Sequence, residues 1–151
     1  MIIKLDINDR AALAIKNNQK RVEIRANDNK YDYSKLNSND IIEFNSNNIG
    51  IFYVKVKEVN FYNSLEELFM LEGTRYTTSS TNDKDEAIKN VEKIVNYKES
   101  IKQNGVYAIH IEYLYSENTV WEELYDHCKN VLNGRVISDS IDAGGVAAAI
   151  L

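Results

Sequence analysis

The sequence predicts an α+β protein, built as a small β-barrel with peripheral helices and an appended C-terminal helix. Two observations lead to this fold class. Short stretches at close spacing alternate apolar and polar residues, as half-buried strands do. Between and after them, four stretches open with a helix-capping residue and continue with apolar residues along one side of a helix.

The strands come mostly from the first half of the chain. The alternating stretches are residues 2–7, 20–26, 40–44, 49–61 and 105–115. Residues 45–48 are rich in Asn and Ser and predict a hairpin turn, and residues 27–39 read as a structured loop.

Helix starts are marked by capping residues. Asn8 or Asp9 precedes an alanine-rich helix that ends at Asn17-Asn18. The later starts are Ser64, Asp83 and Thr119. Residues 97–104 carry no such signal, and no element is assigned to them.

Two parts of the chain differ in character. Residues 1–116 contain all the predicted strands and form one domain. Residues 117–151 comprise an amphipathic helix and an apolar tail, which we expect to pack on the domain or on a partner. If it packs on a partner, the helix would mediate formation of a homodimer or contact another protein.

Composition excludes several classes of protein. The single cysteine, Cys128, excludes an intramolecular disulfide framework. No secretory leader and no long apolar run is visible, so we expect a cytoplasmic protein without membrane association. Neither a phosphate-binding glycine loop nor a His/Cys spacing suited to zinc occurs, so we expect no cofactor and no metal.

Charge is distributed unevenly. Residues 1–60 carry ten Lys/Arg and eight Asp/Glu, whereas the remainder carries eight and fifteen. The basic excess is densest from Arg10 to Lys35, with seven basic and three acidic residues. Duplex nucleic acid usually requires a more basic protein, so the patch fits a single-stranded or nucleoside-sized ligand, or else solvated surface.

The stretch 20–26 holds the strongest candidate site. Side chains alternate along a strand, so Val22 and Ile24 would face a core while Arg21, Glu23 and Arg25 share the opposite face. With Lys20 at the preceding turn, this face predicts a polar cleft. Arg25 suits phosphate or a base edge, and it would also form a salt bridge to Glu23. The plainer alternative is an exposed turn lysine beside a strand ion pair.

Residues near this strand complete the candidate binding set. Tyr31, Tyr33 and Tyr97 could stack on a nucleobase, although tyrosines are frequent throughout the chain. The predicted RNA- or nucleotide-binding residues are Lys20, Arg21, Glu23, Arg25, Asn27, Tyr31 and Tyr97.

Taken in order, four segments resemble the ASCH domain, a PUA-like β-barrel family associated with RNA. They are Asn18-Gln19-Lys20-Arg21-Val22-Glu23-Ile24-Arg25, Asn39-Asp40-Ile41-Ile42-Glu43-Phe44, Ser64-Leu65-Glu66-Glu67-Leu68, and Tyr97 through Gly105-Val106-Tyr107-Ala108-Ile109. The resemblance covers residues 2–115. Asn18 and Asn39 replace two family glycines; because Asn tolerates positive φ, the backbone should be retained at both positions.

The resemblance also implies an enzymatic alternative. Some family members are amidohydrolases that act on acetylated cytidine with a Lys, a Thr and a Glu. The family lysine falls on Lys20, whereas the threonine position holds Glu23, a departure that weakens the analogy. Glu72 is the nearest candidate for the third residue. The leading interpretation is therefore a module that binds RNA or a modified nucleotide. An amidohydrolase acting on an acylated nucleoside such as N4-acetylcytidine, and a protein-interaction module using the C-terminal helix, are the alternatives.

Overall fold

The computed structural model describes residues 2–28 and 30–117. The predicted helix from Thr119 and the apolar tail lie outside these residues. The strands are β1 (Ile2–Asp6), β2 (Val22–Arg25), β3 (Ile41–Ser46), β4 (Gly50–Tyr62) and β5 (Val106–Ser116). The helices are α1 (Asp9–Lys16), α2 (Leu65–Glu72), α3 (Lys84–Glu92) and α4 (Tyr97–Asn104), with a short 3-10 helix, η1, at Tyr33–Lys35.

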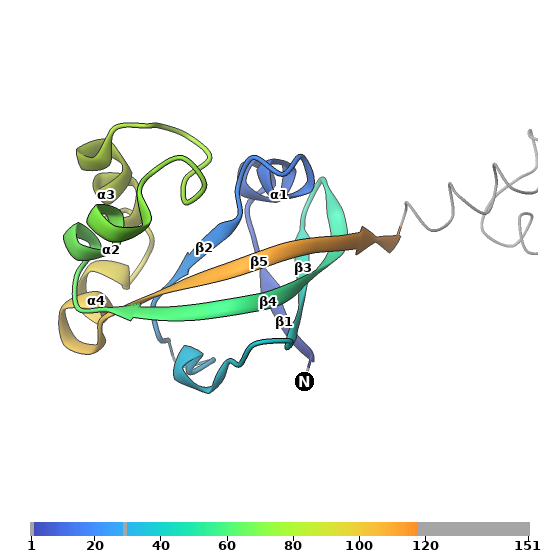
Figure 1. Ribbon diagram of the computed structural model, residues 1–151, viewed down its shortest axis with the longest axis horizontal. Helices are drawn as coiled ribbons and strands as arrows, with labels where there is room; N and C mark the ends of the chain where they lie inside the picture. The colour runs from blue at the N-terminus through green and yellow to red at the C-terminus, as the bar shows by residue number, and fades with distance from the viewer. Residues whose placement is uncertain (1, 29, 118–151) are drawn as a thin grey trace, which may run out of the picture. The chain divides into compact units, whose positions relative to one another are not determined.

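The strands form one mixed sheet in the order β1-β3-β4-β5-β2. β1 runs parallel to β3, while β3 pairs antiparallel with β4, and β2 with β5 (Figure 1). The α+β class is confirmed. Closure into a barrel is not confirmed, because β1 and β2 remain the two edges of the sheet. A side chain bridges these edges instead: Arg25 Nη2 donates to the Asp6 carbonyl oxygen at 2.8 Å.

Two apolar cores lie on opposite sides of β2 and β5. In their register Val22 is opposite His110 and Glu23 opposite Ile109, so successive residues of β2 face different cores. Val22 and Ile24 pack in the core formed with α2, α3 and α4, which gather at one end of the sheet (Figure 1). The second core contains Ile3, Ile15, Tyr33, Ile42, Phe44, Phe52, Val54, Tyr107 and Ile109.

Local capping chemistry accounts for the predicted helix starts. The side chains of Asn8, Ser64 and Asp83 accept hydrogen bonds from main-chain N–H groups of the first helical turns of α1, α2 and α3. The expected left-handed conformations are confirmed as well, with φ of 60° at Asn18 and 74° at Asn39.

Helix α4 was not predicted. Its N-cap, Asn96, is itself left-handed (φ 67°) and makes no side-chain capping bond. Ile101 is the one buried residue of the helix. The segment therefore lacks both the capping signal and the apolar stripe on which sequence reasoning depends. None of the helices in the described part of the chain is long and apolar enough to cross a membrane.

Candidate functional site

Lys20 is buried rather than exposed at a turn. Only 5% of the residue is accessible, and its Nζ donates to the carbonyl oxygens of Val22 (2.7 Å) and Thr77 (2.6 Å). Glu23 Oε1 lies 3.4 Å from the same nitrogen. An ammonium group has three N–H donors, so these three acceptors match it. Lys20 thus fastens the loop after α2 to β2.

Lys20, Glu23 and Arg25 form a buried row of alternating charges. Glu23 Oε2 accepts from Arg25 Nε at 3.2 Å and from Nη2 at 2.9 Å, which confirms the predicted ion pair. Nη2 also donates to the Asp6 carbonyl oxygen. The guanidinium lies 5.8 Å from the centre of the Phe44 ring. Arg25 is therefore held in one orientation from two sides.

The three neighbouring charges of Lys20, Glu23 and Arg25 change one another's pKa values. Burial by itself would raise the pKa of Glu23, but the positive charges of Arg25 and Lys20 have a larger effect in the opposite direction. The pKa of Glu23 is therefore lowered from its usual value, and the carboxyl stays ionised. Burial lowers the pKa of Arg25, and the Glu23 charge more than restores it, leaving it above its usual value. Burial lowers the pKa of Lys20, which Glu23 only partly offsets.

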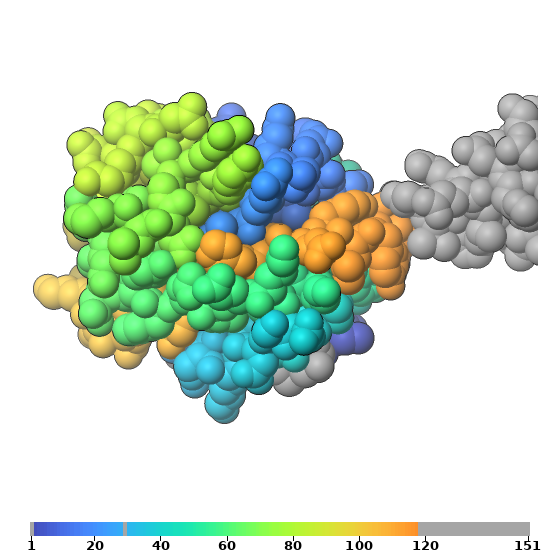
Figure 2. Space-filling model, viewed as in Figure 1, coloured from blue at the N-terminus to red at the C-terminus, as the bar shows by residue number. Residues whose placement is uncertain are grey.

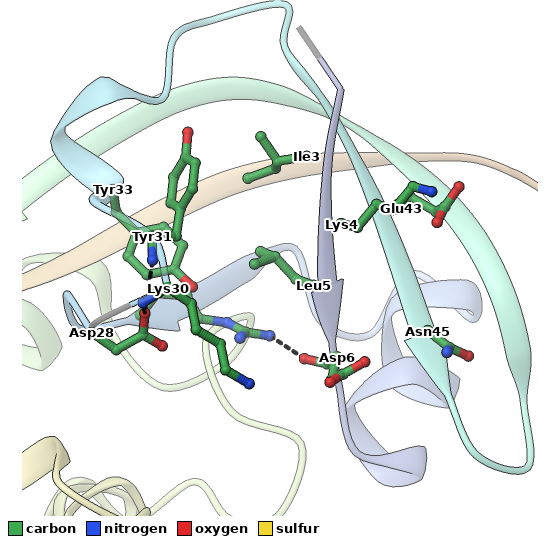
Figure 3. Close-up of a pocket in the computed structure, with 11 residues that line it drawn as sticks. Ile3, Lys4, Leu5, Asp6, Asp28, Lys30, Tyr31, Tyr33, Glu43 and Asn45 are labelled. Atoms are coloured by element: carbon green, nitrogen blue, oxygen red, sulfur yellow. Dashed lines mark hydrogen bonds between the residues drawn. The ribbon is translucent and has the colours of Figure 1, made fainter.

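A pocket of about 470 Å³ opens where Arg25 reaches β1. We call it the arginine pocket. Its lining residues are Ile3, Lys4, Leu5, Asp6, Arg25, Asp28, Lys30, Tyr31, Tyr33, Glu43 and Asn45. Figure 3 shows β1 and β3 forming one wall, with Asp28, Lys30, Tyr31 and Tyr33 opposite. Lys20 and Glu23 are not among the lining residues; Glu23 pairs with Arg25, and Lys20 pairs with Glu23.

The loop after β2 shapes the second wall through local hydrogen bonds. Asp28 Oδ1 accepts from the main-chain N–H groups of Lys30 (2.7 Å) and Tyr31 (2.9 Å), and Asn27 Oδ1 accepts from Tyr33 N (2.8 Å). Tyr31 and Tyr33 meet edge to face, with ring centres 5.0 Å apart. In the described residues, the Tyr31 hydroxyl is the one buried side-chain polar atom without a hydrogen-bond partner.

The remaining predicted residues lie in three other places. Arg21 is exposed before β2, with its guanidinium 4.3 Å from the centre of the Tyr76 ring. Asn27 and Tyr97 line a neighbouring pocket beside α4. Glu72 is held by other partners, described next.

Glu72 belongs to a separate polar cluster. Its carboxylate accepts from Asn60 Nδ2 (3.0 Å) and Tyr62 Oη (2.7 Å) and lies 2.8 Å from His110 Nε2. Burial by itself would raise the pKa of Glu72, but these hydrogen bonds and His110 together outweigh that effect, so the pKa is lowered from its usual value. His110 is opposite Val22 in the sheet, so this cluster and Glu23 are on different faces. In the part of the chain that the structure describes, no group of three or more His, Cys, Asp or Glu could hold a metal ion.

Sequence reasoning did not identify the pocket residues supplied by β1 and β3. Lys4, Asp6, Glu43 and Asn45 lie far from residue 25 in the chain and reach the site only through strand pairing. Their polar positions on alternating strands were visible, but nothing marked them as different from solvated side chains. Asp28 did carry a local signal, because Asp readily accepts from main-chain N–H groups two and three residues ahead.

Comparison with known proteins agrees with this architecture. The model of the ASCH domain family matches residues 5–114. The crystal structure of hypothetical protein PH0355 is similar, with a TM-score of 0.66 and 28% identity over 76% of this chain and 100% of that one. The solution structure of protein PF0455 from Pyrococcus furiosus aligns with a TM-score of 0.61 and 28% identity, covering 76% of this chain and 98% of that one. Among curated proteins, none matches the sequence significantly. Since the family model spans most of the described residues, the chain belongs to the ASCH domain family.

Proposed function

We propose that the arginine pocket binds one nucleoside unit of an RNA or of a modified nucleotide. The ASCH domain is a PUA-like family thought to bind RNA. The observation that carries the proposal is the fixed guanidinium of Arg25 in the wall of a pocket that also contains the Tyr31 ring. A volume of about 470 Å³ lies within the usual range for sites of small ligands.

The two side chains supply complementary interactions. Arg25 is oriented by Glu23 and the Asp6 carbonyl, which engage its Nε and Nη2. The two N–H groups of Nη1 would therefore be the ones that donate to a phosphate or a base edge. Little conformational entropy would be lost when Arg25 binds. The Tyr31 ring offers a stacking face worth on the order of 1–3 kcal/mol per base.

The balance of charges in the arginine pocket restricts the kind of ligand that it can bind. Three basic residues line the pocket (Lys4, Arg25 and Lys30), and so do three acidic ones (Asp6, Asp28 and Glu43). A nearly neutral site does not attract a polyanion strongly, so contacts with the base and sugar would supply most of the affinity. A nucleoside, or a nucleotide with few phosphate contacts, fits this balance better than a long phosphate track does.

Replacing Arg25 by Gln tests the proposal. Nucleoside 5′-monophosphates are titrated into wild type and variant by calorimetry, with far-UV circular dichroism to confirm folding. We expect at least about tenfold weaker binding, because the charge-assisted hydrogen bonds are lost. Arg10, which is exposed and outside the pocket, gives a matched control, and Arg10→Gln should bind like wild type.

A second variant guards against misfolding of the first. Tyr31→Ala leaves the buried ion pairs in place and should weaken binding by about 1–3 kcal/mol through loss of stacking. Wild-type affinity in both Arg25→Gln and Tyr31→Ala would refute the proposed site.

One observation favours the amidohydrolase alternative. Lys20 is buried, its pKa is lowered by desolvation, and Glu23 lies 3.4 Å away, a setting that can activate a lysine. In that reading Lys20 activates the attacking group and Glu23 carries protons. Glu72, the third residue suggested by the sequence, bonds His110 on the other face of the sheet and does not join them. Lys20 would have to exchange one of its present acceptors for substrate. Incubation with N4-acetylcytidine decides the matter: release of cytidine that disappears in Lys20→Ala supports hydrolysis, and absence of product at high protein concentration eliminates it.

A further inference from the structure

A second pocket adjoins the arginine pocket. Its volume is about 680 Å³, and the two pockets share Asp28 and Lys30 as lining residues. We call it the amide pocket. It is lined by Asn27, Asp28, Lys30, Val95, Asn96, Tyr97, Glu99, Ser100, Gln103 and Asn104. Most of these residues come from α4 and the turn before it.

The lining of the amide pocket has the chemistry of a base-recognition site. Asn96, Gln103 and Asn104 are exposed, and Asn and Gln amides pair with the donor and acceptor groups of base edges. Tyr97 adds an aromatic ring. Among the lining residues Lys30 is the one cation, against the acidic Asp28 and Glu99. The pocket therefore suits a neutral, planar group with hydrogen-bonding edges better than it suits a phosphate.

The boundary between the two pockets is built by hydrogen bonds. Ser100 Oγ donates to the Asn27 carbonyl oxygen at 2.6 Å, which ties α4 to the loop after β2. The Asn27 side chain is itself bound to Asp32 (3.2 Å) and to Tyr33 N (2.8 Å). These bonds fix α4 against the loop that forms the wall of the arginine pocket. The two pockets thus keep one relative position.

The shared edge is suited to a single negative charge. The Asp28 carboxylate is engaged by the N–H groups of Lys30 and Tyr31, and it holds the turn that presents the exposed Lys30. Figure 3 shows Asp28 and Lys30 together at this side of the arginine pocket. A phosphodiester between two nucleosides carries one charge, and Lys30 belongs to both pockets.

We propose that the two pockets form a dinucleotide site. One nucleoside occupies the arginine pocket, the base of its neighbour occupies the amide pocket, and Lys30 contacts the phosphodiester that joins them. This inference rests on the proposed function and specifies its ligand: two successive nucleotides of a single strand, not an isolated nucleoside.

The test compares ligands of different length on the full chain. The four nucleoside 5′-monophosphates and the full set of dinucleoside monophosphates are titrated at one salt concentration. We expect the best dinucleotide to bind about tenfold or more tightly than either of its mononucleotides, as stacking and edge contacts to a second base predict. The double variant Gln103→Ala/Asn104→Ala should lose this gain and keep its mononucleotide affinity. Gln19→Ala, an exposed amide outside both pockets, is the matched control and should keep the gain.

The outcomes separate the two proposals. If mononucleotides bind in an Arg25-dependent manner and dinucleotides bind no more tightly, the amide pocket is not a subsite and the proposed function stands. A dinucleotide gain that survives in the double variant also overturns the inference. Absence of binding by every mononucleotide and dinucleotide overturns both proposals.

Discussion

Replacing Glu23 by Gln would remove the one negative charge between two buried cations. The side chain of Glu23 is 9% accessible, and its oxygens lie 3.4 Å from Lys20 Nζ and 2.9 Å from Arg25 Nη2. Gln keeps the shape of the side chain, but it leaves both cations without this ion-pair partner. Breaking a buried ion pair by changing one member typically costs about 3–5 kcal/mol. We therefore expect the free energy of unfolding to fall by about that amount.

Urea unfolding followed by circular dichroism measures the change, with the midpoint read at an unchanged slope. Glu66→Gln is the matched control, because Glu66 pairs with Lys84 at the surface, where their side chains are 55% and 42% accessible. Exposed pairs contribute about 0–1 kcal/mol. If Glu23→Gln were no more destabilising than Glu66→Gln, the claim that the buried charges of Lys20, Glu23 and Arg25 stabilise this part of the fold would be refuted.

The same comparison has a predicted pH dependence. The pKa of Glu23 is lowered because Arg25 and Lys20 outweigh the effect of burial. A carboxyl with a lowered folded-state pKa stabilises the fold above its unfolded pKa of about 4.3, and that contribution is lost as pH falls through the folded value. The stability advantage of wild type over Glu23→Gln should therefore be full at neutral pH and shrink below about pH 4. An advantage that grows on acidification would contradict the sign.

Three further predictions concern the backbone and the ligand. Gly73 (φ +75°) has open space around an added Cβ, whereas at Gly105 (φ +78°) the added atom would meet the Phe61 ring and lie 2.7 Å from a main-chain oxygen. Chemical denaturation should show Gly73→Ala costing about 1–3 kcal/mol from strain, and Gly105→Ala about 1–3 kcal/mol more from overpacking; equal costs would contradict this. Asn18, at φ 60°, should tolerate Gly but lose about 1–2 kcal/mol as Ala, and the order of the two melting temperatures checks it. For mononucleotides, the logarithm of the association constant should fall against the logarithm of salt concentration with a slope no steeper than about −1, and a much steeper slope would indicate a phosphate-tracking surface instead.

The local features of the fold could be predicted because their causes are local. Asn8, Ser64 and Asp83 cap helices through bonds to residues two or three positions away. Asn18 and Asn39 adopt positive φ because their short polar side chains tolerate that conformation. The family itself was visible in four ordered segments, and the match over residues 5–114 confirms it. Helix α4 was missed because its formation depends on packing around Ile101 rather than on a cap.

Burial of the charged stretch could not be predicted in the same way. Alternation correctly separated Val22 and Ile24 from Glu23 and Arg25, but it also suggested that the second face was a cleft. That face is largely interior, because Ile109 lies opposite Glu23 and the Phe44 ring lies beside the Arg25 guanidinium. In the space-filling view of Figure 2, the segment after α2 (green to yellow-green) lies directly against the N-terminal segment (blue). Lys20 is buried because the loop around Thr77 folds over it, a contact between residues 57 positions apart.

The sequence by itself determined the helix caps, the left-handed turns, the alternating faces of the strands and the pairing of Arg25 with Glu23. Each follows from the conformational preference of a residue or from neighbours within a few positions. Only the tertiary structure decided that Lys20 and Glu23 lie outside the arginine pocket, that Glu72 faces the other side of the sheet, and that two pockets meet at Asp28 and Lys30. Those arrangements depend on strand order and loop packing, which bring together residues whose separation in the chain carries no local signal.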